Sequence, residues 1–192
     1  MMSAQASTGS ASVHCQPSPG ARLAFVFICP GRFEASRGYP CAAGTGANLA
    51  RVLIELNRRA PALFPSPQRA AYVITNAWAQ VEYPALTGRS VPSESEVLEP
   101  SNLMRLESEI AAVERVIACG AQAHAAMRAI AARRPALEVA YARHLSQRSV
   151  NMIAGGSNTA ERIARWADLV LGQLPGTAGG LAAWQQNPSS VL

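Results

Sequence analysis

Short apolar runs alternate with segments of helical periodicity along the middle of the chain. Four runs are closed by Gly, Pro or polar residues, as buried parallel strands are, and they cover residues 23–29, 72–75, 115–119 and 137–141. Apolar positions at helical spacing predict helices at 47–59, 93–99, 103–113, 121–133 and 159–171. This alternation predicts an α/β fold, with three α/β/α layers around a short four-stranded parallel sheet.

The two ends of the chain differ in composition from its middle. Residues 1–20 are rich in Ser, Ala, Gly, Gln and Pro, which predicts a flexible N-terminal tail. Residues 175–192 are rich in Gly, Ala, Gln and Ser, with Trp184 as the only large side chain, and predict a C-terminal tail. The intervening residues, 21–174, are enough for one domain with its own core.

Charge and composition narrow the possible partners. The 192 residues include 17 basic and 12 acidic side chains, giving a net charge of +5, and every basic residue is Arg. Arg carries a planar fork of donors suited to phosphate, which favours a polyanion partner. A GC-rich genome would explain the missing Lys equally well, but not the basic sign.

Other classes of protein are disfavoured. No apolar run approaches the roughly 18 residues of a membrane span, and the N-terminus lacks the pattern of a secretory signal, so we expect a cytoplasmic protein without a membrane partner. The four cysteines are scattered, and none forms a Cys-x-x-Cys pair. We therefore expect free thiols, no metal site and no cofactor.

Ligands of parallel α/β sheets bind at the carboxyl ends of the strands. This rule selects the loops at residues 29–46, 75–92, 119–123 and 142–151. The first has Pro-Gly directly after a strand and, six residues later, Gly-Tyr-Pro-Cys; the second has Ile-Thr-Asn-Ala; the third has Cys-Gly-Ala-Gln; the last has His-Leu-Ser-Gln-Arg.

These four motifs, in this order, resemble those of the uracil-DNA glycosylase superfamily over about residues 23–170. The resemblance implies hydrolysis of the N-glycosidic bond of uracil or another deaminated base in DNA, with water as the nucleophile. The DNA would be single-stranded or have an extruded base, and the protein would act as a monomer. Asn76 would read the base, because an amide offers both a donor and an acceptor. His144 would stabilise the charge that develops on the leaving base.

The same motifs imply phosphate contacts. Ser146 and Arg148 would hold phosphates of the DNA backbone. Gly120, with the amides of Ala121 and Gln122 at the start of a helix, could hold another. Each of these residues also has an ordinary interpretation, as a polar loop or a strand–helix turn, and Asn76 and His144 could likewise be structural.

The first motif departs from the family. The family places a polar group just before Pro30-Gly31, where this chain has Ile28-Cys29. Cys29 could act only as a thiolate, and burial would oppose that by raising its pKa. Glu34 is the carboxylate inside the motif and therefore our candidate for activating water.

The base-binding positions implied by the resemblance are Cys29, Pro30, Gly31, Cys41 and Asn76. Cys41 stands where the family has a Phe that stacks on the flipped base. Phe33 and Tyr39 are the alternative candidates for that stacking.

Three hypotheses follow. The first is a DNA base glycosylase, and the second is a catalytically inactive protein of the same fold that binds DNA or a base. The third is an unrelated nucleotide-binding α/β protein that holds a phosphate with Gly44-x-Gly46, although the full dinucleotide fingerprint is absent.

Overall fold

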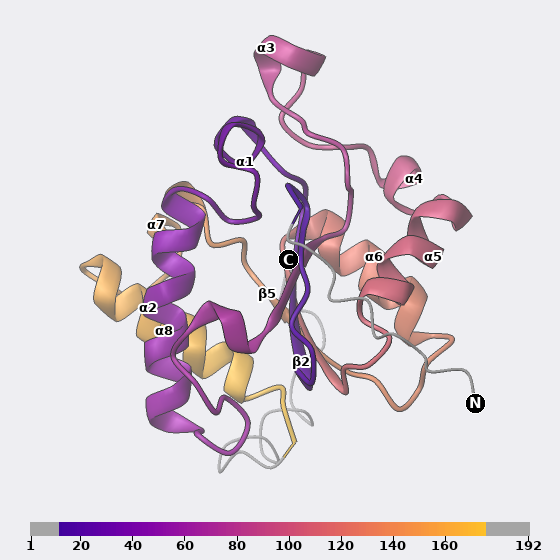
Figure 1. Cartoon of the computed structure of the whole chain (residues 1–192). Coiled ribbons are helices and arrows are strands. Elements are labelled where there is room, and N and C mark those ends of the chain that lie inside the picture. Colours follow the sequence, from indigo (N-terminus) through magenta and orange to yellow (C-terminus); the bar gives the residue numbers. More distant parts are fainter. Residues whose placement is uncertain (1–11, 176–192) are drawn as a thin grey trace.

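The computed structural model describes residues 12–175 and shows an α/β fold with one mixed sheet (Figure 1). The strands are β1 (Cys15–Gln16), β2 (Leu23–Phe27), β3 (Val73–Asn76), β4 (Arg115–Cys119) and β5 (Glu138–Ala142). The helices are α1 (Arg32–Arg37), α2 (Gly44–Arg59), the 3-10 helix η1 (Arg69–Ala71), α3 (Pro84–Thr87), α4 (Glu94–Val97), α5 (Pro100–Glu109), α6 (Ala121–Ala131), α7 (Gln147–Asn151) and α8 (Thr159–Leu171).

The sheet has five strands in the order β1-β3-β2-β4-β5. The four expected strands pair in parallel, but β1 adds to β3 in the antiparallel direction, so the prediction of a four-stranded parallel sheet was incomplete. Strand β1 lies at residues expected to belong to the N-terminal tail. It has no apolar run, and its pairing depends on the open edge of β3, which the local sequence does not reveal.

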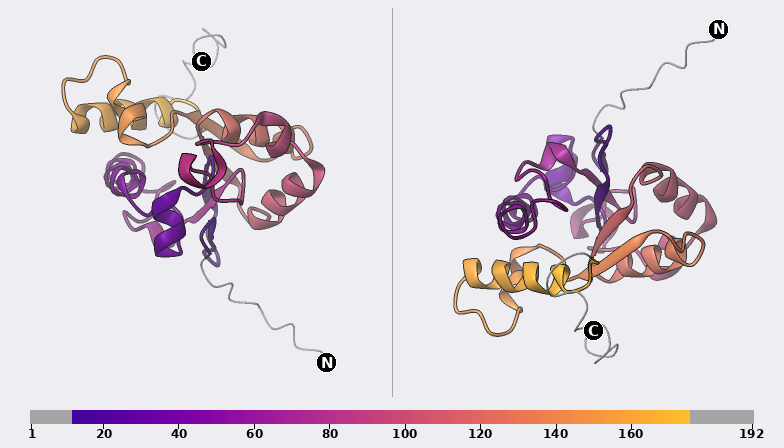
Figure 2. Two further views of the ribbon diagram at one scale, coloured as in Figure 1. Left: turned by 90° about the horizontal axis from the view of Figure 1, so that it is seen from above. Right: turned by 90° about the horizontal axis from the view of Figure 1, so that it is seen from below.

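Helices cover both faces of the sheet (Figures 1 and 2). On one face, α2, α7 and α8 enclose a core that includes Phe25, Phe27, Ile74 and Trp166. On the other face, α4, α5 and α6 enclose a second core that includes Val26 and Met127. The three-layer arrangement follows from burial of both sheet faces, which explains the continuous apolar run of β2.

Short helices account for most of the remaining differences from the sequence prediction. The segments expected as polar loops contain α1, α3 and α7, each six residues or fewer. Such helices have too few turns to show an apolar periodicity in the sequence. Hydrogen bonds at their ends stabilise them instead. Within residues 12–175, no helix has both the length and the apolar character needed to cross a membrane.

The carboxyl ends of β2 and β3 continue into loops that remain paired. Ala77 N donates to Phe27 O at 2.7 Å, and Trp78 N donates to Ile28 O at 3.0 Å. Further along, Glu82 N donates to Pro30 O at 2.9 Å. These bonds hold the first two candidate loops side by side above the carboxyl edge of the sheet.

Candidate functional site

Phe27 lies between two of the predicted site residues. It is the register partner of Asn76 on the neighbouring parallel strand, so both side chains point to the sheet face covered by α2. The Phe27 ring also contacts His144 edge-on, with ring centroids 5.6 Å apart. The fold therefore brings Asn76 and His144 to the same neighbour, although they are distant in sequence.

His144 is a neutral hydrogen-bond donor. Burial lowers the pKa of its imidazole to about 4, even though the charge of Glu34 acts in the opposite direction. Its Nδ1 accepts a hydrogen bond from the backbone N–H of Ser146 at 3.0 Å. Because Nδ1 is an acceptor, the ring proton is on Nε2 in the neutral form.

The amide of Asn76 is oriented by the backbone of His14, the residue directly before β1. Asn76 is buried, and its Nδ2 donates to the carbonyl oxygen of His14 at 3.1 Å. No described residue donates to its Oδ1. This oxygen keeps some contact with solvent, although the residue as a whole is buried. The side chain therefore retains an acceptor and a second N–H for a ligand.

Glu34 combines a structural contact with a position close to the other candidates. Its Oε2 accepts from Gly31 N at 3.1 Å and its Oε1 from Ala42 N at 3.1 Å, which closes the first-motif loop around α1. Its negative charge acts on the pKa values of both His144 and Cys29. A carboxylate with one donor on each oxygen still has free lone pairs that can accept from water.

Cys29 is a protonated thiol. Burial raises its pKa to about 12, with further contributions from the charges of Glu82 and Glu34. Its Sγ lies 3.7 Å from Ser90 O as a weak donor. Cys29 therefore supplies no base at the position where the resembling family has a polar group.

Glu82 is a buried carboxylate near Cys29 that the sequence analysis missed. Its two oxygens accept from Arg89 at 2.6 and 3.0 Å, and Trp78 Nε1 donates to Oε1 at 3.1 Å. The Arg89 hydrogen bonds lower the pKa of Glu82, so it stays ionised and paired. Its position in the 75–92 loop could have indicated a site residue. Its pairing with Arg89 depends on the tertiary structure and could not be predicted.

The proposed stacking residues lie on the first-motif loop. Cys41 is buried with a left-handed φ of 54°, so it fills a tight bend, and its thiol pKa is raised by burial. Phe33 is exposed beneath the guanidinium of Arg32, and Tyr39 beneath that of Arg69. An aromatic ring is therefore exposed beside the site, but not at the position of Cys41.

The two glycines of the third hypothesis differ in their surroundings. A Cβ at Gly46 would lie 2.1 Å from the carbonyl oxygen of Cys41, whereas a Cβ at Gly44 would meet nothing within 4 Å. Close backbone packing thus explains Gly46 without a bound phosphate.

The expected phosphate contacts lie at the starts of α6 and α7. Gly120 has φ 100° and precedes α6, and a Cβ there would clash with the Ile28 side chain. Of the positions expected to bind the base, Pro30 and Gly31 lie before α1, and Gly31 is its N-cap. Ala121 is the first residue of α6, and Gln122 Nε2 donates to Pro92 O at 3.3 Å.

Ser146 and Arg148 serve different purposes in the last motif. Ser146 is the N-cap of α7, where its side chain accepts from Ser149 N, and its own N–H fixes His144. Arg148 is exposed, and no described residue forms an ion pair with it. Arg148 is therefore free to meet a phosphate.

Asn48 is a further residue that the sequence analysis missed. It is completely buried on α2, and its Nδ2 donates to Leu145 O at 3.0 Å and to Gln147 Oε1 at 3.3 Å. It thus anchors the last motif. The sequence could have indicated this role, because Asn48 is a polar residue beside Leu49 on the apolar face of the helix.

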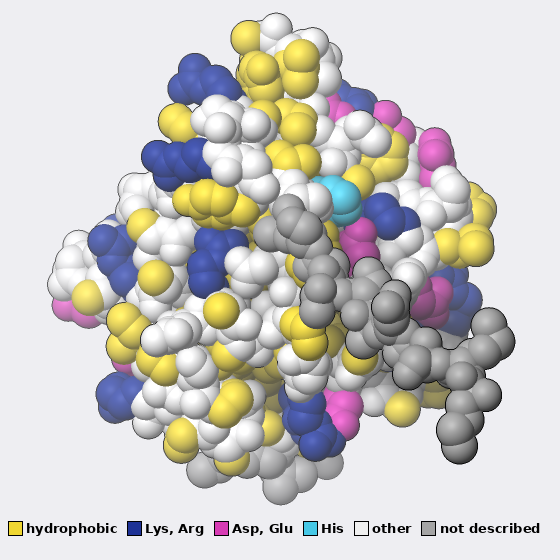
Figure 3. Space-filling model, in the orientation of Figure 1, with side chains coloured by type: hydrophobic (Ala, Val, Ile, Leu, Met, Phe, Trp, Pro, Cys, Tyr) yellow, Lys and Arg dark blue, Asp and Glu magenta, His cyan; other side chains and the backbone are white. Residues whose placement is uncertain are grey.

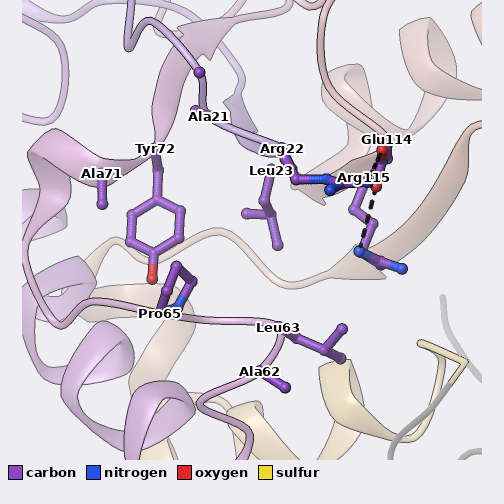
Figure 4. A pocket seen from close by; sticks show the side chains of 11 residues that line it. Ala21, Arg22, Leu23, Ala62, Leu63, Pro65, Ala71, Tyr72, Glu114 and Arg115 are labelled. Carbon is purple, nitrogen blue, oxygen red and sulfur yellow. Dashed lines mark hydrogen bonds and ion pairs between the residues drawn. The ribbon is translucent and has the colours of Figure 1, made fainter.

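A pocket of about 750 Å³ begins at His144 and runs along β5 between α6 and α8. Ile28 and Gly120 line it beside His144, whereas Asn76 and Glu34 do not. A second pocket, of about 440 Å³, lies at the amino end of the sheet between Leu23 and Tyr72, with the Arg22–Glu114 ion pair beside it (Figure 4). The second pocket is remote from all four candidate loops.

Basic side chains gather over α1 and α2 on the face seen in Figure 3, with few acidic groups among them. These helices carry Arg32, Arg37 and Arg51, all exposed. Among residues 12–175, no cluster of three or more His, Cys, Asp or Glu side chains is arranged to hold a metal ion.

The structure thus defines an α/β protein whose candidate site lies at the carboxyl edge of its sheet. No protein-family model matches the chain, and no curated protein matches it.

Proposed function

We propose that the protein is a DNA base glycosylase that removes uracil or another deaminated base. The observation that carries the proposal is the geometry of His144: a neutral imidazole, with Nδ1 occupied by a backbone amide and Nε2–H available as a donor. This is the form of histidine suited to stabilising an anionic leaving group without first losing or gaining a proton. The fold alone would not favour this activity over others.

In the proposed reaction, an extruded nucleotide presents its base to Asn76 and His144 at the carboxyl edge of the sheet. The bond between the base nitrogen and C1′ breaks, and the base takes the bonding electrons. Water adds to C1′ and loses a proton, while His144 Nε2–H donates to the oxygen on which negative charge builds. Asn76 holds the edge of the base through its amide.

Glu34 is the proposed acceptor for the proton of water. Its two backbone donors fix the carboxylate, and lone pairs remain for water. Exposed arginines on α1 and α2, with Arg148, would hold the phosphates.

The test is release of bases from single- and double-stranded oligonucleotides that contain uracil, hypoxanthine or xanthine, measured as alkali-labile abasic sites. We expect His144→Ala to lower the single-turnover rate by about 10²–10³, the usual effect of losing a transition-state donor. Asn76→Ala should reduce the rate similarly.

Asn57→Ala is the matched control for Asn76→Ala. Asn57 also donates its amide to a backbone carbonyl, that of Phe64, but it lies near the carboxyl end of α2. Its loss should leave the rate unchanged. Full activity in a double variant that lacks both His144 and Asn76 would refute the assignment.

A second candidate is a protein that binds an extruded base without cleaving it. The protonated thiol of Cys29 favours this candidate, because it leaves the usual position of the water-activating group without a base. Tight binding of uracil-containing DNA, with no abasic sites after hours, would distinguish it from the glycosylase.

A further inference from the structure

Strand β1 reaches the candidate site from the N-terminal side of the domain. Its residues Cys15 and Gln16 pair with Thr75 and Ile74, and His14 is the residue directly before the strand. At this point the backbone oxygen of His14 accepts the hydrogen bond from Asn76 Nδ2. The residue that leads into this unpredicted strand thus contacts the proposed base-reading side chain.

The His14 side chain is anchored on the face of β3 that lies opposite the Asn76 side chain. Its Nε2 lies 3.1 Å from Glu109 Oε1, and it must be the donor because a carboxylate oxygen only accepts. Glu109 is largely buried at the end of α5, where it also accepts from Thr75 Oγ1 and from Arg105 Nη1. Burial acts to raise the pKa of Glu109, but the hydrogen bonds from His14, Thr75 and Arg105 outweigh it and lower the pKa.

Arg105 connects this cluster to Asn76 a second time. Its Nη2 donates to the backbone oxygen of Asn76 at 3.0 Å, while its Nη1 donates to Glu109 at 2.7 Å. Both the backbone and the amide of Asn76 are therefore tied to the same cluster, the amide through His14.

On the other side, Gln16 secures β1 to the first-motif loop. Gln16 Nε2 donates to Arg69 O at 3.1 Å, and Arg69 Nε donates to Gln16 Oε1 at 2.9 Å. Arg69 also donates to Pro40 O at 2.6 Å and to Cys41 O at 3.2 Å. The His14–Glu109 contact and the Gln16–Arg69 contact thus hold β1 in place at its two ends.

The His14 carbonyl determines which end of the Asn76 amide is the nitrogen. A carbonyl oxygen can only accept, so a flipped amide would place two acceptors against each other. The amide therefore presents its acceptor and its second donor in one fixed order. A deaminated base and its amino parent have opposite orders along this edge: uracil has a carbonyl beside a ring N–H, and cytosine has an amino group beside a bare ring nitrogen.

We propose that His14, held by Glu109, is a positioning residue that fixes the Asn76 amide and so restricts the site to a base edge with a carbonyl beside a ring N–H. This inference rests on the proposed function. The positioning itself is a property of the folded chain and can be measured without DNA.

The first experiment follows the side-chain amide of Asn76 by NMR in the full-length, ¹⁵N-labelled protein, with Asn76→Asp assigning the signal. His14→Ala and Glu109→Gln should each shift the two amide proton resonances and speed their exchange with water. His14→Gln, which can still donate to Glu109, should restore much of the wild-type signal. The matched control is Glu114→Gln, an exposed acid paired with Arg22 at the opposite edge of the sheet.

The second experiment measures binding of single-stranded oligonucleotides that differ only in one uracil or cytosine. The wild type should prefer uracil, and His14→Ala should reduce this preference by about tenfold, since a freed amide can flip to pair with either base. Binding of an oligonucleotide with neither base should change little.

The proposal is overturned if the Asn76 resonances are unchanged in both His14→Ala and Glu109→Gln, or if these variants keep the full uracil preference. A wild-type protein that neither prefers uracil nor releases it would instead refute the proposed function and the base-reading role. The amide signals would then still show whether β1 holds Asn76, so the two failures are distinguishable.

Discussion

At the scale of single residues, one backbone amide determines the chemical form of His144. The Ser146 N–H occupies Nδ1, and the surrounding residues exclude water, so the ring is a neutral donor through Nε2. Burial also raises the pKa of Cys29, so its thiol stays protonated well above neutral pH. Desolvation thus suits the histidine for its proposed task and removes the cysteine from consideration as a base.

The lowered pKa of His144 predicts a specific pH dependence of stability. In the unfolded chain the ring takes up a proton below about pH 6.5, whereas in the folded protein it does so only near pH 4. The free energy of unfolding should therefore fall as the pH drops from about 6.5 to 4, with His144 contributing at most about 3 kcal/mol.

The measurement is urea unfolding of the wild type and of His144→Asn at intervals across this range. The variant should start less stable, because it loses the ring contact with Phe27, and then gain on the wild type as the pH falls. The pKa of His124 is also lowered by burial, but His124 is present in both proteins, so its contribution cancels in the comparison. Parallel stability curves would show that His144 titrates normally.

At the scale of elements, the start of α2 shows how a helix and a loop constrain each other. The first-motif loop passes so close to α2 that the Cys41 carbonyl lies where a Cβ of residue 46 would be. Asn48, two residues further on, anchors the last motif. This helix therefore supports two of the four candidate loops.

Two glycine substitutions in this turn should have opposite effects. Gly46→Ala should lower the free energy of unfolding by about 2 kcal/mol or more, because the added methyl group meets backbone that cannot move away. Gly44→Ala should be neutral or stabilising by up to about 1 kcal/mol, since it has open space and restricts the unfolded chain. Thermal or urea unfolding measures both, and equal effects would contradict the packing.

At the scale of the whole molecule, the charge distribution favours a polyanion over a small neutral ligand. The net charge is +5, and arginines concentrate over α1 and α2 beside the site (Figure 3). By contrast, Arg133 pairs with Glu107 on the side of α5 and α6, away from the site.

Arg148→Ala should weaken binding to single-stranded DNA and reduce its salt dependence. Losing one phosphate contact should lower the slope of log K against log salt concentration by about 0.7. Arg133→Ala removes the same charge from the molecule, so it is the matched control and should leave the slope almost unchanged. Equal slopes for the two variants would show that only net charge matters.

The hydrophobic pattern of the sequence was sufficient to predict the main strands and the last helix. Strands at 23–29, 72–75, 115–119 and 137–141 and the last helix were confirmed to within two residues at each end, because their apolar residues are buried in continuous runs or at helical spacing. The order of strand and helix also implied that the four loops follow carboxyl strand ends, where His144 and Asn76 lie.

Contacts between distant segments could not be predicted in this way. Hydrogen bonds between distant residues produce no periodic pattern in the sequence. They form strand β1, the Asn48 anchor, the Glu82–Arg89 pair and the His14–Glu109 contact. The amino-acid sequence by itself determined where apolar surface must be buried, and hence the α/β fold. Only the tertiary structure decided the protonation of His144 and the orientation of Asn76, because desolvation and hydrogen-bond partners arise when remote loops meet.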